Sequence, residues 1–319
     1  MSHVIISAAP AAEAAAVEEL RRAAPTAEVV RRLEVGTLLV AVADPLDTLL
    51  PAWEAQPPIW VRHVHPVQVS LPLLPGESGL ARLVAAAEPL AALLDPAQPF
   101  AVQSRLVGEG PWPQTRFDMN ERLATLLAAH SRAPLDVPQP QQVLSLTATA
   151  ERAYLGVSPV RLNLSAWAGG QMRFARAPGQ ISRSEFKLLE ALAVFDLTLP
   201  ARGLRVVAVD PAELDPRLVG VPEIRHVRVH AQKFNPGIQR FALITNDMRM
   251  DALEAAQFMN RIHDWLQPGG FGIVTLKLPE YRFATVAVAA LALLSEAYSV
   301  IGARQLFHNR SEITAAVRF

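Results

Sequence analysis

The chain has 319 residues, of which 51% are hydrophobic, and its 30 basic and 30 acidic residues give a formal net charge of zero. This length allows two or three domains with a sizeable core. The absence of cysteine excludes disulfides, zinc–thiolate sites and cysteine nucleophiles. Residues 166–319 carry 18 basic and 14 acidic side chains, a mildly basic balance that suits a polyanionic partner.

The N-terminus, MSHVIISAAP, has no basic region followed by a long apolar stretch, which argues against a signal peptide. The longest apolar run, from Phe283 to Leu294, is shorter than the roughly 20 residues that a membrane-spanning helix needs. We therefore expect a cytoplasmic protein without a membrane-spanning segment.

Residues 1–72 alternate as β-α-β-β-α-β, the order of a ferredoxin-like α+β domain. His63 and His65 share one face of its last strand, expected at 60–71. No third ligand accompanies them, so we interpret them as surface residues and predict no metal site. The remaining strands are expected at 4–7, 27–33 and 37–42, and the helices at 11–24 and 45–53.

A second domain is expected over residues 73–165. Helical spacing covers 80–94 and 118–130, a strand is expected at 100–106, and 143–148 and 152–157 form a predicted hairpin. The stretch 163–178, which contains Gly169-Gly170, is typical of a linker.

Residues 166–319 alternate strands and helices, which predicts an α/β domain with a mostly parallel sheet covered on both faces. The expected helices span 184–195, 251–266 and 283–298, and Pro268-Gly269-Gly270 ends the second of them. The expected strands span 204–209, 226–230, 241–246 and 272–278, followed by an antiparallel pair at 300–307 and 313–319.

Only three of the thirty basic residues are lysines: Lys187, Lys233 and Lys277. Lysine, unlike arginine, can lose its proton when its surroundings lower its pKa. Asp247 and Lys277 end predicted strands, where chemistry gathers in an open parallel sheet, and Glu312 starts the last strand. Each charge alone is ordinarily a solvated edge charge or a helix cap. The combination with Lys187 predicts a cleft for proton transfer.

These positions lie in stretches that resemble the FtsJ-like ribosomal RNA 2′-O-methyltransferases, in the form with an N-terminal THUMP-type RNA-binding region. The matching stretches are SRSEFKLLEAL (182–192), VVAVDPAELDP (206–216), TNDMRMDA (245–252), LQPGGFGIVTLKLP (266–279), RQLFHNRSEITAAVRF (304–319) and, for the THUMP hairpin, DVPQPQQVLSLTATAERAYLGVS (136–158). The resemblance implies a Rossmann-like methyltransferase domain at 166–319, preceded by a THUMP-like domain at 73–165 and the ferredoxin-like domain at 1–72.

The resemblance also implies a reaction, the transfer of a methyl group from S-adenosylmethionine to a ribose 2′-hydroxyl of RNA. Members of the family act on ribosomal RNA, so the resemblance implies that substrate here. The family's catalytic tetrad falls on Lys187, Asp247, Lys277 and Glu312. Lys277 would be the general base or would orient the hydroxyl, Asp247 and Lys187 would tune its protonation, and Glu312 would hold the network. Asp210 matches the acid beside the cofactor ribose, and Asp247 also lies at the cofactor site.

One element of the family's pattern is missing from the sequence. The family carries a strand, a glycine-rich DLGxxPGGW-type loop and a helix before the strand that ends in the ribose acid. Lys187 and Asp210 are only 23 positions apart, which leaves no room for them. We therefore expect that the first βα unit is absent, that S-adenosylmethionine binds weakly or not at all, and that 204–209 pairs directly with 241–245.

Two interpretations of function remain open from the sequence. The chain is an RNA 2′-O-methyltransferase, or it is an RNA-binding relative that keeps the tetrad without catalysis. Arg173, Arg176 and Arg183, ahead of Lys187, are predicted to contact RNA phosphates, with ordinary surface charge as the alternative.

Overall fold

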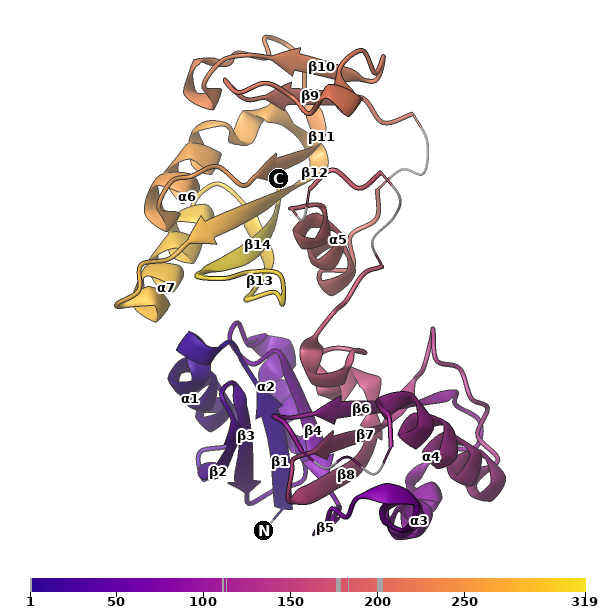
Figure 1. Cartoon of the computed structure of the whole chain (residues 1–319). Helices are drawn as coiled ribbons and strands as arrows, with labels where there is room; N and C mark the ends of the chain where they lie inside the picture. Colours follow the sequence, from indigo (N-terminus) through magenta and orange to yellow (C-terminus); the bar gives the residue numbers. More distant parts are fainter. Residues whose placement is uncertain (1, 111, 113, 176–178, 183, 200–202) are drawn as a thin grey trace. The chain divides into compact units, whose positions relative to one another are not determined.

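The computed structural model describes residues 2–110, 112, 114–175, 179–182, 184–199 and 203–319. The chain divides into two compact units, Met1–Arg173 and Phe174–Phe319 (Figure 1). Within the described residues, the first unit carries two four-stranded sheets, and the second carries one four-stranded and one two-stranded sheet. No helix among the described residues of either unit combines the length and the apolar composition that a bilayer span requires.

The first sheet has the strand order β2-β3-β1-β4, and all of its neighbouring strands are antiparallel. Its elements follow the predicted β-α-β-β-α-β order. Their bounds are β1 (Ser2–Ser7), α1 (Glu13–Ala23), β2 (Glu28–Glu34), β3 (Thr37–Val42), α2 (Leu50–Ala55) and β4 (His63–Val67). The central strand β3 is buried along its whole length, so this sheet has its core there.

The second sheet has the order β5-β8-β7-β6, in which only β6 and β7 run parallel. Its elements are β5 (Val69–Pro72), α3 (Gly76–Ala87), β6 (Phe100–Leu106), α4 (Arg116–Ser131), β7 (Gln142–Ala148) and β8 (Arg152–Pro159). Helix α4 begins with a capping box, in which the Thr115 hydroxyl accepts from the Asp118 amide and the Asp118 carboxylate accepts from the Thr115 amide.

The single strand expected at 60–71 is wrong, because the chain changes sheets at Gln68. Residues up to Val67 belong to β4, and β5 begins at Val69 in the other sheet. At this break the Gln68 side-chain amide binds the backbone of β8: it accepts from the Val157 amide at 2.6 Å and donates to the Val157 carbonyl at 3.1 Å.

The interpretation of His63 and His65 as surface residues is also wrong, since each is only 2% exposed. Strand β8 covers β4 so closely that a Cβ at Gly156 would lie 2.0 Å from the Pro66 carbonyl oxygen. Period-two spacing shows that two side chains share a face, but it cannot show that a second sheet covers that face. In the described part of the chain, no group of three or more His, Cys, Asp or Glu side chains is arranged to hold a metal.

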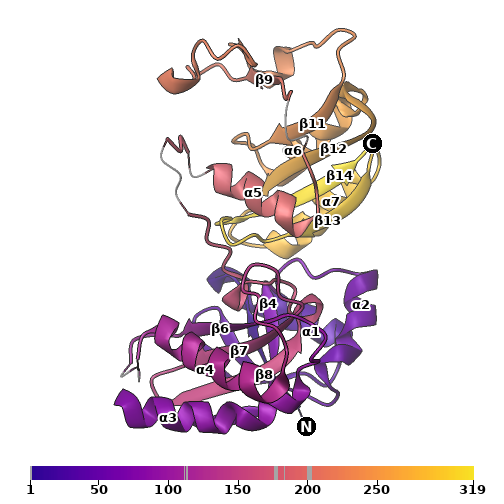
Figure 2. The same cartoon turned by 90° about the vertical axis from the view of Figure 1, so that its right-hand side faces the viewer.

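The larger sheet of the second unit has the order β11-β12-β14-β13, with β11 parallel to β12 and the other pairs antiparallel. Helix α5 lies on one face of this sheet, and α6 and α7 lie on the other (Figures 1 and 2). The bounds are α5 (Ser184–Val194), β11 (Phe241–Asn246), α6 (Ala252–Arg261), β12 (Leu266–Lys277), α7 (Phe283–Leu294), β13 (Ser299–Arg304) and β14 (Glu312–Arg318).

The helix expected over 251–266 is too long. Helix α6 ends at Arg261, and Pro268-Gly269-Gly270 lies inside β12 instead of ending a helix. A Cβ at Gly270 would lie 3.1 Å from the Phe241 carbonyl oxygen, so glycine permits this close approach of β11 to β12. The register of the two strands shifts at this point, as at a β-bulge.

The predicted pairing of 204–209 with 241–245 is wrong. Strand β9 (Val206–Val209) pairs in parallel with β10 (Ile224–Val227) in a separate sheet, and β11 pairs with β12. No described residue between α5 and β9 lies in a strand, and no described strand pairs with both β9 and β11. Residues 203–240, which contain the small sheet, include no buried side chain. The α/β part of the second unit is therefore divided into two separate sheets.

Candidate active site

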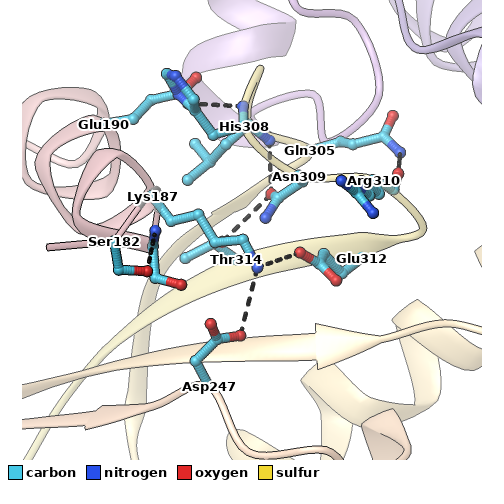
Figure 3. Close-up of polar contacts among 12 residues, drawn as sticks. Ser182, Lys187, Glu190, Asp247, Gln305, His308, Asn309, Arg310, Glu312 and Thr314 are labelled. Carbon is cyan, nitrogen blue, oxygen red and sulfur yellow. Dashed lines mark hydrogen bonds and ion pairs between the residues drawn. The ribbon is translucent and has the colours of Figure 1, made fainter. Parts of the chain in front are cut away.

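The Lys187 ammonium lies between two carboxylates that come from distant parts of the sequence (Figure 3). It forms an ion pair with Glu312, the first residue of β14, and lies 3.5 Å from Oδ1 of Asp247, which directly follows β11. The exposed fractions of the side chains are 21% for Lys187, 10% for Glu312 and 40% for Asp247. The cluster is therefore shielded on the Glu312 side and open on the Asp247 side.

These contacts favour the charged form of Lys187. Burial disfavours the ammonium, but the hydrogen bond to Glu312 and the negative charges of Asp247 and Glu312 outweigh burial and raise the pKa of Lys187 above its ordinary value. A charged lysine has no free lone pair with which to take a proton from an alcohol. The contacts of Lys187 therefore suit a cation between two carboxylates.

Lys277 is placed differently. It is the last residue of β12 and lies directly opposite Glu312 in the β12–β14 register, so both side chains project from the same face of the sheet. Its ammonium forms no ion pair or hydrogen bond with any residue that the structure describes. It lines a hollow of about 560 Å³ together with Arg249, Leu278 and Val286. The lining of this hollow includes Lys277 but not Lys187, Asp247 or Glu312.

Asp210, the predicted acid for the cofactor ribose, lies apart from this cluster in the fold. It directly follows β9 and is exposed, and its Oδ1 accepts a hydrogen bond from the Ala212 amide at 2.8 Å. Asp247, the other predicted cofactor residue, follows β11 in the other sheet. The parallel sheet that would align the carboxyl ends of these two strands is not continuous.

Of the three arginines predicted to contact RNA, the structure describes only Arg173. Arg173 is exposed, and its Nη2 donates to Oε1 of Gln171 at 2.6 Å. Arg176 and Arg183 lie outside the described residues. Their contact with RNA phosphates stays a prediction.

Two residues near the cluster were missed by the sequence reasoning. Glu190 is 3% exposed and binds the loop between β13 and β14, and His308 in that loop is its side-chain partner at 2.6 Å. The spacing contained a signal, because Glu190 lies one helical turn after Lys187 and therefore shares its face of α5.

The comparisons with known proteins relate the chain to RNA methyltransferases. It is 28% identical over 204 residues to the ribosomal RNA large subunit methyltransferase M of Methylococcus capsulatus, a match that covers 54% of this chain and 56% of that protein. The protein of the same name from Shewanella frigidimarina is 24% identical, with 53% and 52% covered. That from Halorhodospira halophila is 32% identical over 123 residues, with 38% and 35% covered.

The chain thus spans about half or less of the length of these curated relatives. No family model matches it. Among solved structures, TrmN from Thermus thermophilus aligns with 100% of this chain and 99% of its own, at 21% identity and a TM-score of 0.42. A possible methylase from Clostridium difficile aligns over 100% and 97%, at 11% identity and a TM-score of 0.41.

Proposed function

We propose that this chain binds RNA and presents a ribose 2′-hydroxyl to the cluster of Lys187, Asp247, Lys277 and Glu312. The names of its sequence relatives suggest that this RNA is ribosomal. The chain would then carry the acceptor-binding half of an RNA ribose 2′-O-methyltransferase. The observation that carries this proposal is the unequal placement of the two lysines: both carboxylates contact Lys187, while Lys277 has no carboxylate contact among the described residues and belongs to the lining of a hollow.

In this proposal each residue has a distinct role. Lys277 contacts the incoming hydroxyl and either accepts its proton or orients its lone pair. Lys187 offsets the repulsion between Asp247 and Glu312 and so allows two carboxylates to remain beside the hydroxyl. Arg249, on the wall of the same hollow, offers a cation for a neighbouring phosphate.

The residues for the methyl donor do not fit in the same way. S-adenosylmethionine would supply the methyl group, but Asp210 and Asp247 follow strands of separate sheets, and 195–205 contains no glycine pair to let the backbone approach a cofactor. We therefore propose that the first βα unit is absent and that the chain alone binds S-adenosylmethionine weakly or not at all. We derive no transfer step from this chain.

RNA binding tests the acceptor half of the proposal. Lys277→Ala should weaken binding of bulk ribosomal RNA, because the contact with the ribose hydroxyl is lost, and should leave the slope of log affinity against log salt nearly unchanged, because no phosphate contact is lost. Lys233→Ala is the matched control, since it removes an equal charge outside the cluster. Equal affinity of wild type and Lys277→Ala for the RNA would contradict the acceptor half.

A second candidate function, RNA binding without catalysis, is favoured by the division of the sheet. Transfer of labelled methyl groups from S-adenosylmethionine to RNA distinguishes the two. Transfer that Lys277→Ala abolishes would support the enzyme, whereas Lys277-dependent RNA binding without transfer would support the binding protein. Micromolar cofactor affinity by calorimetry would overturn our expectation for the donor half.

A further inference from the structure

Helix α5 carries a second acidic residue that holds the loop leading into Glu312. The buried Glu190 carboxylate accepts three hydrogen bonds from this loop: from the Phe307 amide at 2.6 Å, from the His308 amide at 3.0 Å and from Nδ1 of His308 at 2.6 Å. Three bonds to one buried side chain determine both the position and the orientation of the loop relative to α5.

The loop is also closed internally (Figure 3). Oδ1 of Asn309 accepts from the Leu306 amide at 2.8 Å and from the Thr314 hydroxyl at 3.3 Å. The Leu278 amide donates to the Ser311 carbonyl at 2.9 Å, which ties the loop to the residue after Lys277. A movement of α5 relative to the loop would therefore reach both Glu312, which follows the loop, and Lys277, which precedes Leu278.

An aromatic contact reinforces the same attachment. The His308 ring lies 5.2 Å from the Phe186 ring and 5.9 Å from the Phe174 ring, measured between centroids. Phe186 precedes Lys187 on α5, and Leu306 packs with Ala191 in the core of this unit. Polar and apolar contacts thus join the helix that carries Lys187 to the loop that precedes Glu312.

We propose that Glu190 is a positioning residue, which holds the β13–β14 loop on α5 so that Glu312 meets the Lys187 ammonium. Its importance for RNA ribose chemistry rests on the proposed function, but its effect on the Lys187–Glu312 contact does not. Two long side chains lose rotamer freedom when they pair, so a stable pair requires that both backbones are held in place. The chain achieves this with Glu190, three residues from Lys187 on the same helix.

The composition makes a direct test possible. In the full chain labelled with [13C]lysine, three Cε signals report Lys187, Lys233 and Lys277, and Lys187→Arg identifies the first of them. Glu190→Gln places an amide donor against the Phe307 and His308 amides. We expect the Lys187 signal to titrate at lower pH in this variant than in the wild type, because its contact with a carboxylate is lost.

Glu185→Gln is the control, because it removes an equal charge from the same helix but contacts the Ile181 and Ser182 amides and not the loop. His308→Phe perturbs the loop from the other side and keeps an aromatic ring against Phe186; we expect a smaller shift in the same direction.

An unchanged Lys187 midpoint in Glu190→Gln and His308→Phe, with both variants folded by circular dichroism, would overturn the positioning role. An equal shift in Glu185→Gln would also overturn it, since the effect would then be one of charge alone. The titration involves no methyl transfer, so failure of the proposed function would leave this result intact.

Discussion

Lowering the pH should destabilise the first unit through His65. The ring is buried between the two sheets, where its Nδ1 donates to the Pro66 carbonyl and its Nε2 contacts the Thr147 hydroxyl, each at 2.9 Å. Burial, together with the positive charge of Arg105, lowers the pKa of His65 from 6.5 to about 4, although the hydrogen bond to Pro66 opposes this shift.

The sign and size of the effect follow from proton linkage. Between pH 6.5 and pH 4 the unfolded chain binds a proton at His65 that the folded chain does not, so the free energy of unfolding falls as the pH falls. The interval between the two pKa values, roughly 2.5 pH units, corresponds to about 3 kcal/mol. This stability is fully present above pH 6.5 and is lost as the pH falls towards 4.

Urea unfolding monitored by tryptophan fluorescence measures this loss, because four of the five tryptophans lie in the first unit: Trp53, Trp60, Trp112 and Trp167. His65→Gln keeps a polar side chain but removes the titrating group. The slope of the free energy of unfolding against pH should differ between wild type and His65→Gln. This difference isolates the contribution of His65 from that of the carboxylates, which titrate over the same pH range in both proteins. Parallel stability curves for the two proteins would refute the reasoning.

Three further substitutions should have measurable effects. Lys187→Ala leaves the Glu312 carboxylate without its cation, so thermal unfolding should show a loss of about 1–2 kcal/mol, and Lys187→Arg should lose less; equal losses would contradict the charge argument. Gly156→Ala would place a Cβ 2.0 Å from the Pro66 carbonyl oxygen, and we expect a loss of about 1–3 kcal/mol in urea unfolding; full stability would mean that the two sheets separate easily. Asp251→Ala removes the side-chain cap of α6, and hydrogen exchange should show fraying of its first turn with a loss of about 1 kcal/mol; Asp251→Ser should retain most of that stability.

Local pattern was enough to predict most of the elements around the cluster. The α5 helix, β11 and β14 have strong periodic signals, and the polar residues at their ends predicted that charges would gather at one edge. The structure brings Lys187, Asp247 and Glu312 together and places Lys277 opposite Glu312. Their catalytic roles stay predictions, because proximity shows which groups can interact and not what they react with.

Strand partners were less predictable, because a strand's own sequence does not say which edge it joins. The stretch 204–209 was recognised as a strand, but it pairs with β10, its neighbour along the chain. The Glu190–His308 contact joins residues 118 positions apart, so no local window contains both partners. The burial of His65 has the same origin, since Thr147 comes from another sheet.

The small sheet has a consequence for how long this part of the chain stays protected from solvent. Two four-residue strands without a buried side chain have little to oppose local opening, so backbone amides of Val206–Val209 should exchange with deuterium long before those of β12. Proteases should cleave within 203–240 first. Any ligand that engages Asp210 would have to suppress this local opening as it binds, at a cost in affinity that a continuous sheet would avoid.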